Sequence, residues 1–349
     1  MKKVISDVIQ FRGSHYDFGL MQGDLLLHSS LMQNRKILYE KLKHKFIVDL
    51  PRVNSLLKNF APGIQEEIQG LQDALNITEE QAFLYFGGYY TAYPTSGCSI
   101  VTGSNFLIRN YDNDPFSYDG RFVLYKPTDS GFATIGPTML VTGRMDGMNE
   151  KGLVVGYNFV NTKNRIDGFV CNMIGRILLE RCATTREAID LLNELPHKHS
   201  FNYVLLDASN DAVVVEASPR RIAIRETLAC TNHFHILTDE NRYRMEDSMA
   251  REKIITSAQQ HNLSFYEAFQ LMNGVENGVF AKKYNAWDGT IHTAGYIPTE
   301  RKVMFALGGN ALPIAFDFAS WINDKNIAIS KIKGQLDATA GFVNEAIER

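Results

Sequence analysis

Features that define several large classes of proteins are scarce or missing in this sequence of 349 residues. It has only four cysteines, Cys98, Cys171, Cys182 and Cys230, and no two of them have the Cys-x-x-Cys spacing. This argues against a cysteine-based zinc site and against a disulfide framework. Four scattered thiols fit a reducing compartment, so a cytoplasmic location is expected.

Long apolar runs and a strong excess of one charge are also lacking. No uninterrupted apolar stretch approaches the roughly 18–20 residues that cross a bilayer. The chain begins with basic residues, but Asp7, Gln10 and Arg12 interrupt any signal-peptide core, so secretion is not expected. The formal net charge is −3, and acids and bases are mixed along the chain. We therefore expect neither a nucleic-acid partner nor a membrane partner.

What is present is an ordinary globular composition, with 45% hydrophobic and 21% charged residues, arranged in two different parts. Residues 1–97 have a mostly helical pattern, in which apolar residues recur at helical spacing from Phe18 to Leu26. Thr78-Glu79-Glu80-Gln81 is a capping box that starts a further helix. Pro94-Thr95-Ser96-Gly97 then ends helical structure.

From Cys98 onward the pattern changes to short strands separated by turn residues, with helices between them. The strand-like runs are residues 99–110, 122–126, 153–160, 201–207, 212–217, 291–297 and 303–307. Helices are expected over 172–181, from the capping box at 184–187, from about 239 to 255, and after the cap at 264. Hairpins mixed with helix pairs predict an α+β fold of antiparallel sheets covered by helices.

The stretch from Gly97 to Asp112 carries the most chemical information. Gly103-Ser104 fits a two-residue hairpin turn whose first position takes positive φ. In that register Cys98 lies directly opposite Arg109 on the same face, and Asp112 lies beyond the ladder. A neighbouring guanidinium lowers the pKa of a thiol and enriches the reactive thiolate. Cys98 is therefore the candidate nucleophile, although a lone cysteine at a strand start is more often a small core residue.

Three motifs in chain order support a family resemblance. The first is Cys98 followed by a hairpin that ends in Arg109-Asn110-Tyr111-Asp112. The second is Asp146-Gly147-Met148-Asn149-Glu150-Lys151-Gly152-Leu153 with Gly156-Tyr157-Asn158-Phe159, and the third is Thr231-Asn232-His233-Phe234. Together they resemble signatures of the choloylglycine hydrolase and penicillin V acylase superfamily of N-terminal-nucleophile (Ntn) hydrolases. The long segment before the cysteine resembles the pro-segment of the isopenicillin-N acyltransferase-like branch.

The resemblance implies a four-layer αββα sandwich and a zymogen that cleaves its own Gly97–Cys98 bond. Residues 1–97 would then be the helical pro-segment or α chain, and residues 98–349 the catalytic β chain, packed together as one globular unit. The implied activity is hydrolysis of linear amide C–N bonds, or transfer of an acyl group, through a thioester on Cys98. The implied partner is a small-molecule amide or acyl donor, and a homo-oligomer is compatible with it. No cofactor and no metal are implied.

Roles for the nucleophile and its two nearest partners follow from the same resemblance. The free α-amine that cleavage would leave on Cys98 has a pKa of about 8, which suits a general base near neutral pH. Arg109 would favour the thiolate. Asp112 would hold and orient the amine.

The resemblance also implies oxyanion donors and a substrate-binding arginine. Asn232 and the region of Asn158 would supply the oxyanion donors. Asn158 lies inside a strand-like run, where asparagine is disfavoured, and this favours a functional role over a structural one. Arg251 resembles the substrate-binding arginine of the family, with Arg301 as the alternative.

Other interpretations of the same residues stay open. His197-Lys198-His199 and His233-Phe234-His235 each place two histidines on one strand face, but no carboxylate-rich motif follows, so no metal site is expected. Cys98 served by His233 or His235 would be a papain-like pair that needs no new N-terminus. A protein that kept the fold and lost the activity would act only by binding.

Overall fold

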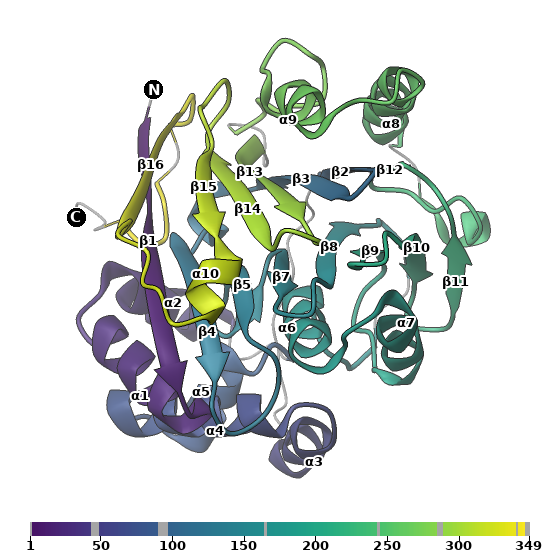
Figure 1. Cartoon of the computed structure of the whole chain (residues 1–349). Helices are drawn as coiled ribbons and strands as arrows, with labels where there is room; N and C mark the ends of the chain where they lie inside the picture. The colour runs from purple at the N-terminus through teal and green to yellow at the C-terminus, as the bar shows by residue number, and fades with distance from the viewer. Residues whose placement is uncertain are drawn as a thin grey trace.

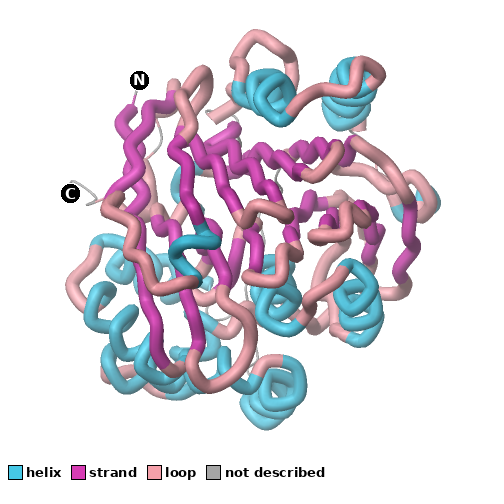
Figure 2. The backbone as a smooth tube through the Cα atoms, in the orientation of Figure 1, coloured by secondary structure: helices cyan, strands magenta, loops and turns pink. Residues whose placement is uncertain are grey.

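The computed structural model describes residues 2–42, 49–89, 97–163, 166–242, 245–284, 289–339 and 341–345. Two sheets face each other across the middle of the molecule, and helices lie on their outer sides (Figure 1). Figure 2 shows the same order of layers, with the magenta strands between cyan helices above and below. This arrangement confirms the predicted α+β class and its four αββα layers.

The larger sheet has ten strands in the order β11-β10-β9-β8-β7-β5-β4-β1-β16, with β6 paired to β5. Its strands are β1 (Lys2–Gly13), β4 (Arg121–Pro127), β5 (Thr134–Met139), β6 (Gly143–Arg144), β7 (Gly147–Asn149), β8 (Val154–Phe159), β9 (Phe201–Leu206), β10 (Ala212–Ala217), β11 (Ile222–Arg225) and β16 (Lys331–Leu336). The smaller sheet has the order β12-β2-β3-β13-β14-β15. Its strands are β2 (Ser99–Gly103), β3 (Phe106–Asn113), β12 (Ala229–Cys230), β13 (Gly289–Ile297), β14 (Lys302–Leu307) and β15 (Ile314–Asp317).

Helices α6 (Cys171–Arg181) and α7 (Thr185–Glu194) cover the larger sheet, and α8 (Glu246–Gln259) and α9 (Phe265–Asn273) cover the smaller one (Figure 1). The short α10 (Phe318–Ile322) follows β15, and the 3₁₀ turns η2 (Pro115–Ser117) and η3 (Thr238–Glu240) lie in connections. Helix α9 begins at the predicted cap, because the Ser264 hydroxyl accepts the Glu267 N–H while the Glu267 carboxylate accepts the Ser264 N–H.

Helix α8 begins later than predicted. It starts at Glu246 rather than near Asp239, where the chain forms only a 3₁₀ turn. The carboxylates of Asp239 and Glu240 bind Arg221, at 2.6 and 3.1 Å, instead of lying along a helix. The Asn241 side chain bonds both backbone groups of Phe234, which fixes the connection as a loop.

Within its described ranges, 2–42 and 49–89, the N-terminal part contains five helices and one strand. The helices are α1 (His15–Leu26), α2 (Ser30–Leu42), α3 (Leu50–Phe60), α4 (Pro62–Leu75) and α5 (Glu79–Phe86), and α5 has the predicted Thr78 capping box. Strand β1, which the helical pattern did not predict, runs parallel to β4 and antiparallel to β16. The larger sheet is therefore mixed, and residues from both sides of position 97 share it.

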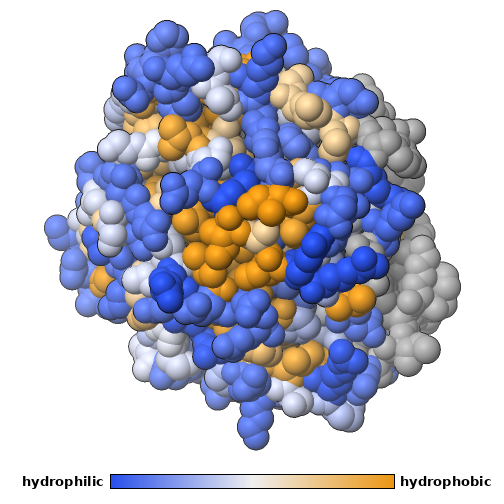
Figure 3. Space-filling model, turned by 90° about the vertical axis from the view of Figure 1, so that its right-hand side faces the viewer, coloured by the Kyte–Doolittle hydropathy of each residue, from blue (hydrophilic) through white to orange (hydrophobic). Residues whose placement is uncertain are grey.

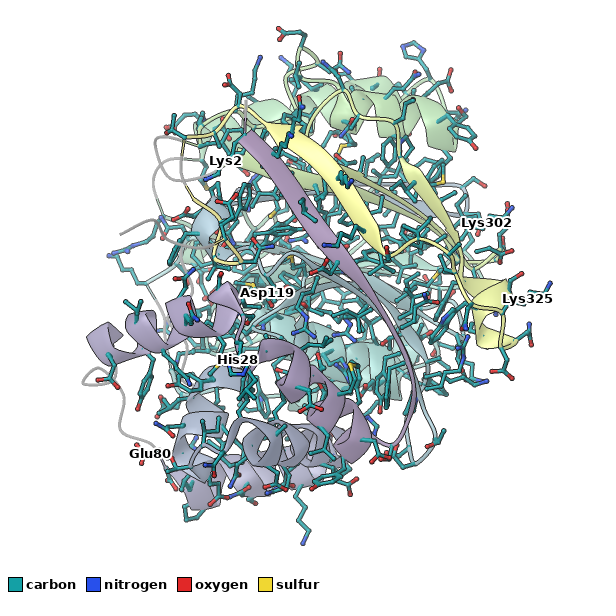
Figure 4. All side chains as sticks on the ribbon, turned by 90° about the vertical axis from the view of Figure 1, so that its left-hand side faces the viewer. Lys2, His28, Glu80, Asp119, Lys302 and Lys325 are labelled. Atoms are coloured by element: carbon teal, nitrogen blue, oxygen red, sulfur yellow. The ribbon has the colours of Figure 1, made fainter. Side chains whose placement is uncertain are left out.

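Buried charges tie the N-terminal helices to the larger sheet. Arg35 on α2 binds Asp119, which lies beside these helices (Figure 4). Glu67 on α4 binds Arg176 on α6 at 2.8 Å, and both side chains are fully buried. Removing one partner of such a pair leaves an uncompensated buried charge, which costs about 3–5 kcal/mol. These pairs therefore fix how the helices lie on the sheet.

Alternate residues of the β2–β3 hairpin face two different cores. Ile100 and Leu107 belong to the main core between the two sheets. Val101 and Ile108 belong to a smaller core under α8 and α9. This alternation decides which hairpin side chains lie inside the sandwich.

Among the described residues, no helix has both the length and the hydrophobicity that a membrane crossing requires. The side of the molecule that carries β11 has an apolar area bordered by hydrophilic residues (Figure 3). On that side Ile224 of β11 is 48% exposed, so apolar surface lies at the free edge of the larger sheet.

Candidate active site

The β2–β3 hairpin forms as predicted, but in a different register. Ser104 and Asn105 are the turn residues, and Ile100 lies opposite Arg109 instead of opposite Leu107. Asn105 supplies the positive φ of the turn, at 61°. Asparagine tolerates this region, and Thr299 binds its side-chain amide at 2.5 Å. The predicted direct opposition of Cys98 and Arg109 is therefore wrong.

Cys98 and Arg109 nevertheless lie on the same face. Ile100 is opposite Arg109, and Cys98 lies two residues before Ile100, so all three side chains point between the sheets. The Nη2 group of Arg109 donates to Cys98 Sγ at 3.3 Å. The guanidinium and the thiol are therefore diagonal neighbours across the two strands, not directly opposed ones.

The thiol of Cys98 is fully buried, and burial outweighs the nearby cation. Burial raises the pKa of the Cys98 thiol to about 11, although Arg109 lowers it. The backbone N–H of Asp112 also donates to Sγ, at 3.5 Å. In the continuous chain the thiol is therefore mostly protonated at neutral pH. Arg109 lowers the pKa of the thiol, as predicted, but by less than burial raises it.

A buried anion, Asp146, holds the Arg109 guanidinium in place. Arg109 Nη1 donates to Asp146 Oδ2 at 2.7 Å, and Nη2 also donates to the Tyr157 carbonyl at 2.6 Å. Asp146 further contacts His292 Nε2 at 3.1 Å and the hydroxyl of Tyr296. Burial alone would raise the pKa of Asp146, but His292 and Arg109 lower it to about 2. Asp146 is therefore a carboxylate at neutral pH.

Asp146 belongs to the second sequence motif, but no role was predicted for it, and His292 was not predicted as a site residue. The one sequence signal for Asp146 is its place at the start of that motif. His292 lies in none of the three sequence motifs, and it reaches Asp146 because β13 pairs with β3, which places His292 opposite Tyr111. Its ring also stacks on Tyr111, with centroids 5.0 Å apart.

Asp112 stays inside the strand ladder, where it pairs with Thr290 on β13. Asp112 does lie beyond the β2–β3 ladder, which ends at the pair Ser99 and Asn110, but it does not curl back, because β13 extends the sheet beyond the end of β2. Asp112 Oδ1 accepts the Thr290 hydroxyl at 2.6 Å. Asp112 contacts the nucleophile through its backbone. Its carbonyl oxygen lies 3.7 Å from Cys98 Sγ.

Asn232 and Arg251 hold the backbone of the candidate nucleophile. Asn232 Oδ1 accepts the Cys98 N–H at 2.9 Å and also a hydrogen bond from Arg251 Nη2 at 3.0 Å. Arg251 Nη1 donates to the Cys98 carbonyl at 2.8 Å and to the Ser99 hydroxyl at 2.6 Å. Arg301, the alternative to Arg251, binds the Glu150 carbonyl instead.

Asn158 lies on the facing, larger sheet, across the sandwich from β2. It is fully buried on β8, and its Nδ2 donates to the carbonyl of Cys230 on β12, the strand that pairs with β2. Its Oδ1 has no hydrogen-bond partner among the described residues. Asn232 likewise uses its Nδ2 on a backbone carbonyl, that of Phe159, at 2.8 Å. Both amides thus hold backbone in the continuous chain.

The two histidines proposed as partners of a papain-like cysteine point elsewhere. His233 Nδ1 lies 2.8 Å from Ser248 Oγ, and His235 Nε2 lies 2.9 Å from Glu252. Among the described residues, the hydrogen bonds of Cys98 are made with Arg109, Asp112, Asn232 and Arg251, and none with a histidine. Donors and acceptors of these four residues therefore hold the cysteine.

Comparison with solved structures finds matches of low sequence identity. Among solved structures, a mutant of the conjugated bile acid hydrolase from Clostridium perfringens matches with a TM-score of 0.47 and 12% identity, over 72% of this chain and 100% of that chain. Penicillin V acylase from Agrobacterium tumefaciens matches with a TM-score of 0.42 and 14% identity, over 64% and 86%. The N-acylethanolamine-hydrolyzing acid amidase ortholog of Caenorhabditis elegans matches with a TM-score of 0.40 and 12% identity, over 58% and 93%.

Sequence comparisons give a narrower result. A search of curated proteins finds no match. The family model described as acyl-coenzyme A:6-aminopenicillanic acid acyl-transferase matches residues 101–312, which is more than half of the chain. The match begins at Val101, inside the hairpin and three residues after Cys98, and it includes the segments of Asp146, Asn158, Asn232 and Arg251. This chain therefore belongs to the acyl-coenzyme A:6-aminopenicillanic acid acyl-transferase family.

Proposed function

We propose that this protein is an autoprocessing amide hydrolase or N-acyltransferase whose nucleophile is Cys98, freed by cleavage of the Gly97–Cys98 bond. Family membership supports amide hydrolysis or acyl transfer in general. The observation that carries the finer assignment is the set of groups on Cys98. A guanidinium lies 3.3 Å from its sulfur, and an asparagine oxygen lies 2.9 Å from its backbone nitrogen.

The proposed self-cleavage is an acyl shift from nitrogen to sulfur. Cys98 Sγ attacks the carbonyl carbon of Gly97, the C–N bond between the two residues breaks, and the nitrogen leaves as an α-amine that takes the thiol proton. Water then hydrolyses the Gly97 thioester and restores the thiol. Asn232 supports this step because its Oδ1 already holds the nitrogen that leaves.

Cleavage also changes the environment of the thiol. In the continuous chain both Gly97 and Cys98 are buried, and burial keeps the pKa of the thiol near 11. Departure of Gly97 opens the sulfur to substrate and weakens this desolvation, while Arg109 stays beside it. The cation then favours the thiolate without the opposing effect of full burial.

In turnover the new α-amine acts as general base. With a pKa of about 8 it takes the thiol proton, Sγ attacks the amide carbonyl of the substrate, and the ammonium returns the proton to the leaving amine. Water or an acceptor amine then resolves the thioester. The substrate class is a small linear amide or acyl donor.

Stabilisation of the oxyanion falls to Asn232 and the region of Asn158. In the continuous chain Asn232 Nδ2 is bound to the Phe159 carbonyl, so the proposed role requires this donor to turn towards the substrate oxygen. One such donor contributes roughly 3–4 kcal/mol to transition-state stabilisation. Arg251, bound to the Cys98 carbonyl, would position the nucleophile and contact the substrate next to it.

Intact-mass spectrometry of the purified full chain tests the proposal. We expect the wild type to yield a fragment that begins at Cys98, and Cys98→Ala to stay one chain without activity on a simple acyl-anilide. Cys98→Ser should fold normally but process and turn over more slowly, because its hydroxyl is the poorer nucleophile. Cys182→Ala is the matched control, since it removes a buried thiol outside the site.

Three outcomes would contradict the proposal. Cleavage at Gly97–Cys98 in Cys98→Ala would show that another group cuts the chain. Activity of an intact, uncleaved wild-type chain would instead favour a cysteine hydrolase that needs no new N-terminus. An intact chain that binds acyl amides and never turns them over would favour a pure binding protein.

A further inference from the structure

Three side chains with metal-ligating atoms meet close to the candidate active site. His233 and His235 lie in the segment that follows β12, directly after Asn232, and Glu252 lies on α8. Their ligand atoms all lie within 4.8 Å of one another. Glu252 Oε2 is 3.2 Å from His233 Nε2 and 2.9 Å from His235 Nε2. The fold therefore supplies the carboxylate that was missing from the sequence around the two histidines.

The hydrogen bonds behind His233 fix which of its nitrogens carries the proton. The Ser248 hydroxyl donates to Thr231 Oγ1 at 2.9 Å, and the Thr231 hydroxyl donates to the Ser248 carbonyl at 3.1 Å. The single proton of the Ser248 hydroxyl is thus already used. His233 Nδ1, 2.8 Å from Ser248 Oγ, must then be the donor of that contact.

In a neutral ring this leaves His233 Nε2 with a lone pair that faces the Glu252 carboxylate, whereas in the imidazolium form Nε2 donates to Glu252 Oε2. Two acceptors 3.2 Å apart repel each other unless a proton or a cation lies between them. A histidine that donates one N–H to a fixed acceptor and turns its other nitrogen to a shared point is the usual arrangement of a metal ligand. His233 has both features.

The distances suit a small tetrahedral cation. Bonds of about 2.0–2.1 Å in tetrahedral geometry put the ligand atoms of zinc about 3.3–3.4 Å apart. The two separations from Glu252 Oε2, 2.9 and 3.2 Å, need only small side-chain adjustments to match. The His235 side chain is 44% exposed and that of Glu252 13%, so an ion and a water ligand can enter from solvent.

We propose that His233, His235 and Glu252 bind one divalent cation of the zinc class, completed by water. The ion would carry no step of the reaction proposed above. Its link to the site is structural, because Ser248 Oγ accepts both the His233 Nδ1–H and the backbone N–H of Asn232, the latter at 2.7 Å. A bound ion therefore holds His233, Ser248 and Asn232 in one rigid arrangement behind the nucleophile.

Titration of the chelator-treated full chain with Zn²⁺ alone tests this site. We expect one equivalent of zinc by calorimetry and by elemental analysis, and a higher Tm at saturating zinc. Co²⁺ in place of zinc should give the intense visible absorption of a four-coordinate site. His235→Ala and Glu252→Gln should each weaken binding at least about tenfold, since second-shell changes alone already cost that much. Both side chains are partly exposed, so these variants should fold.

His261→Ala is the matched control, because this exposed histidine lies just after the same helix, and it should bind zinc like the wild type. No binding to the wild type, or unchanged affinity in both ligand variants, would overturn the proposal and identify the cluster as an imidazolium–carboxylate pair. The same titration on Cys98→Ala is expected to give one equivalent whether or not that chain is cut. The metal site and the nucleophile can therefore fail separately.

Discussion

Cys98 Sγ lies 3.3 Å from Arg109 Nη2, although the two residues are not directly opposite in the hairpin. The contact survives the difference between the expected and the observed register because the pairing moves by two residues along β3, and side chains alternate with period two. A shift by one residue would have turned Arg109 towards α8 and α9. The face was thus determined more strongly than the register.

Arg109→Lys tests what the guanidinium does beyond carrying charge. Lysine keeps the cation but cannot bind Asp146, the Tyr157 carbonyl and the sulfur together. One hydrogen bond to a charged group contributes about 1.5–3 kcal/mol, so we expect processing to slow about tenfold or more. The pKa of the processed thiol should rise, which alkylation rates measured against pH would show. Arg301→Lys, outside the site, is the control, and equal rates in both variants would contradict this role.

Asp146→Asn should destabilise the fold and change how its stability depends on pH in the acid range. Burial raises the pKa of Asp146, but His292 and Arg109 lower it to about 2, below its unfolded value of about 3.9. This carboxylate therefore contributes stability that is complete above pH 4 and lost as the pH falls towards 2. Removing it leaves Arg109 buried and unpaired, at a cost of about 3–5 kcal/mol.

Denaturant unfolding at pH 7 and at pH 3 measures this effect. The loss in Asp146→Asn should be larger at pH 7 than at low pH, because the wild type loses the same contribution on acidification. Asp239→Asn, whose exposed carboxylate binds Arg221 at the surface, should cost less than about 1 kcal/mol. Equal losses in the two variants would show that the buried pair is not special.

Local signals predicted the elements well, and distant partners decided the rest. The capping boxes at Thr78 and Ser264 are contained within four residues, so the sequence alone places those helix starts. Strand β1 escaped detection because its burial does not follow hydropathy: Ser6 is fully buried whereas Ile5 is 40% exposed. The pairing of β1 with β4 and β16 sets that pattern, and no local rule contains it.

In the candidate site, too, some contacts follow from local sequence and others depend on distant partners. Cys98 and Arg109 are linked by one hairpin, and the sequence brought them together. Arg251 reaches the Cys98 carbonyl across 153 residues, because α8 packs on β2. The resemblance singled out Arg251 as a substrate ligand, but its hold on the nucleophile's backbone depends on that packing. Glu252 joins His233 and His235 through the same helix.

Gly103→Val tests the hairpin, for a reason other than the positive φ expected at Gly103. Asn105 now takes the positive φ, but a Cβ on Gly103 would lie 2.3 Å from the buried ring of Phe106. We expect a loss of about 1–3 kcal/mol in denaturant unfolding, as in other overpacked sites. Ser104→Ala, at the exposed turn, should change stability by less than about 0.5 kcal/mol. Tolerance of Gly103→Val would place the turn elsewhere.

Both Gly103-Ser104 and Ser104-Asn105 have residues suited to a two-residue hairpin turn. This ambiguity explains why the predicted register was wrong. Glycine at 103 fits one turn type, while asparagine at 105 fits a turn with positive φ at its second position. Contacts outside the hairpin favour the second: Asn210 Oδ1 accepts the Asn105 N–H at 2.6 Å, and Thr299 holds its side chain.

Asn232→Asp separates the two roles proposed for this side chain. The carboxylate keeps an acceptor for the Cys98 nitrogen but loses the amide donor that now binds the Phe159 carbonyl. We expect cleavage at Gly97–Cys98 to persist, while kcat falls on the order of 10²-fold through loss of one oxyanion donor.

The added negative charge of Asn232→Asp beside the new α-amine favours the ammonium form of that amine and raises its pKa. Because the neutral amine is the base, the rising limb of kcat/KM against pH should move to higher pH. Asn277→Asp, an exposed change on a distant loop, should leave the profile in place. A profile that moves to lower pH, or does not move, would show that Asn232 is not next to the base in the mature enzyme.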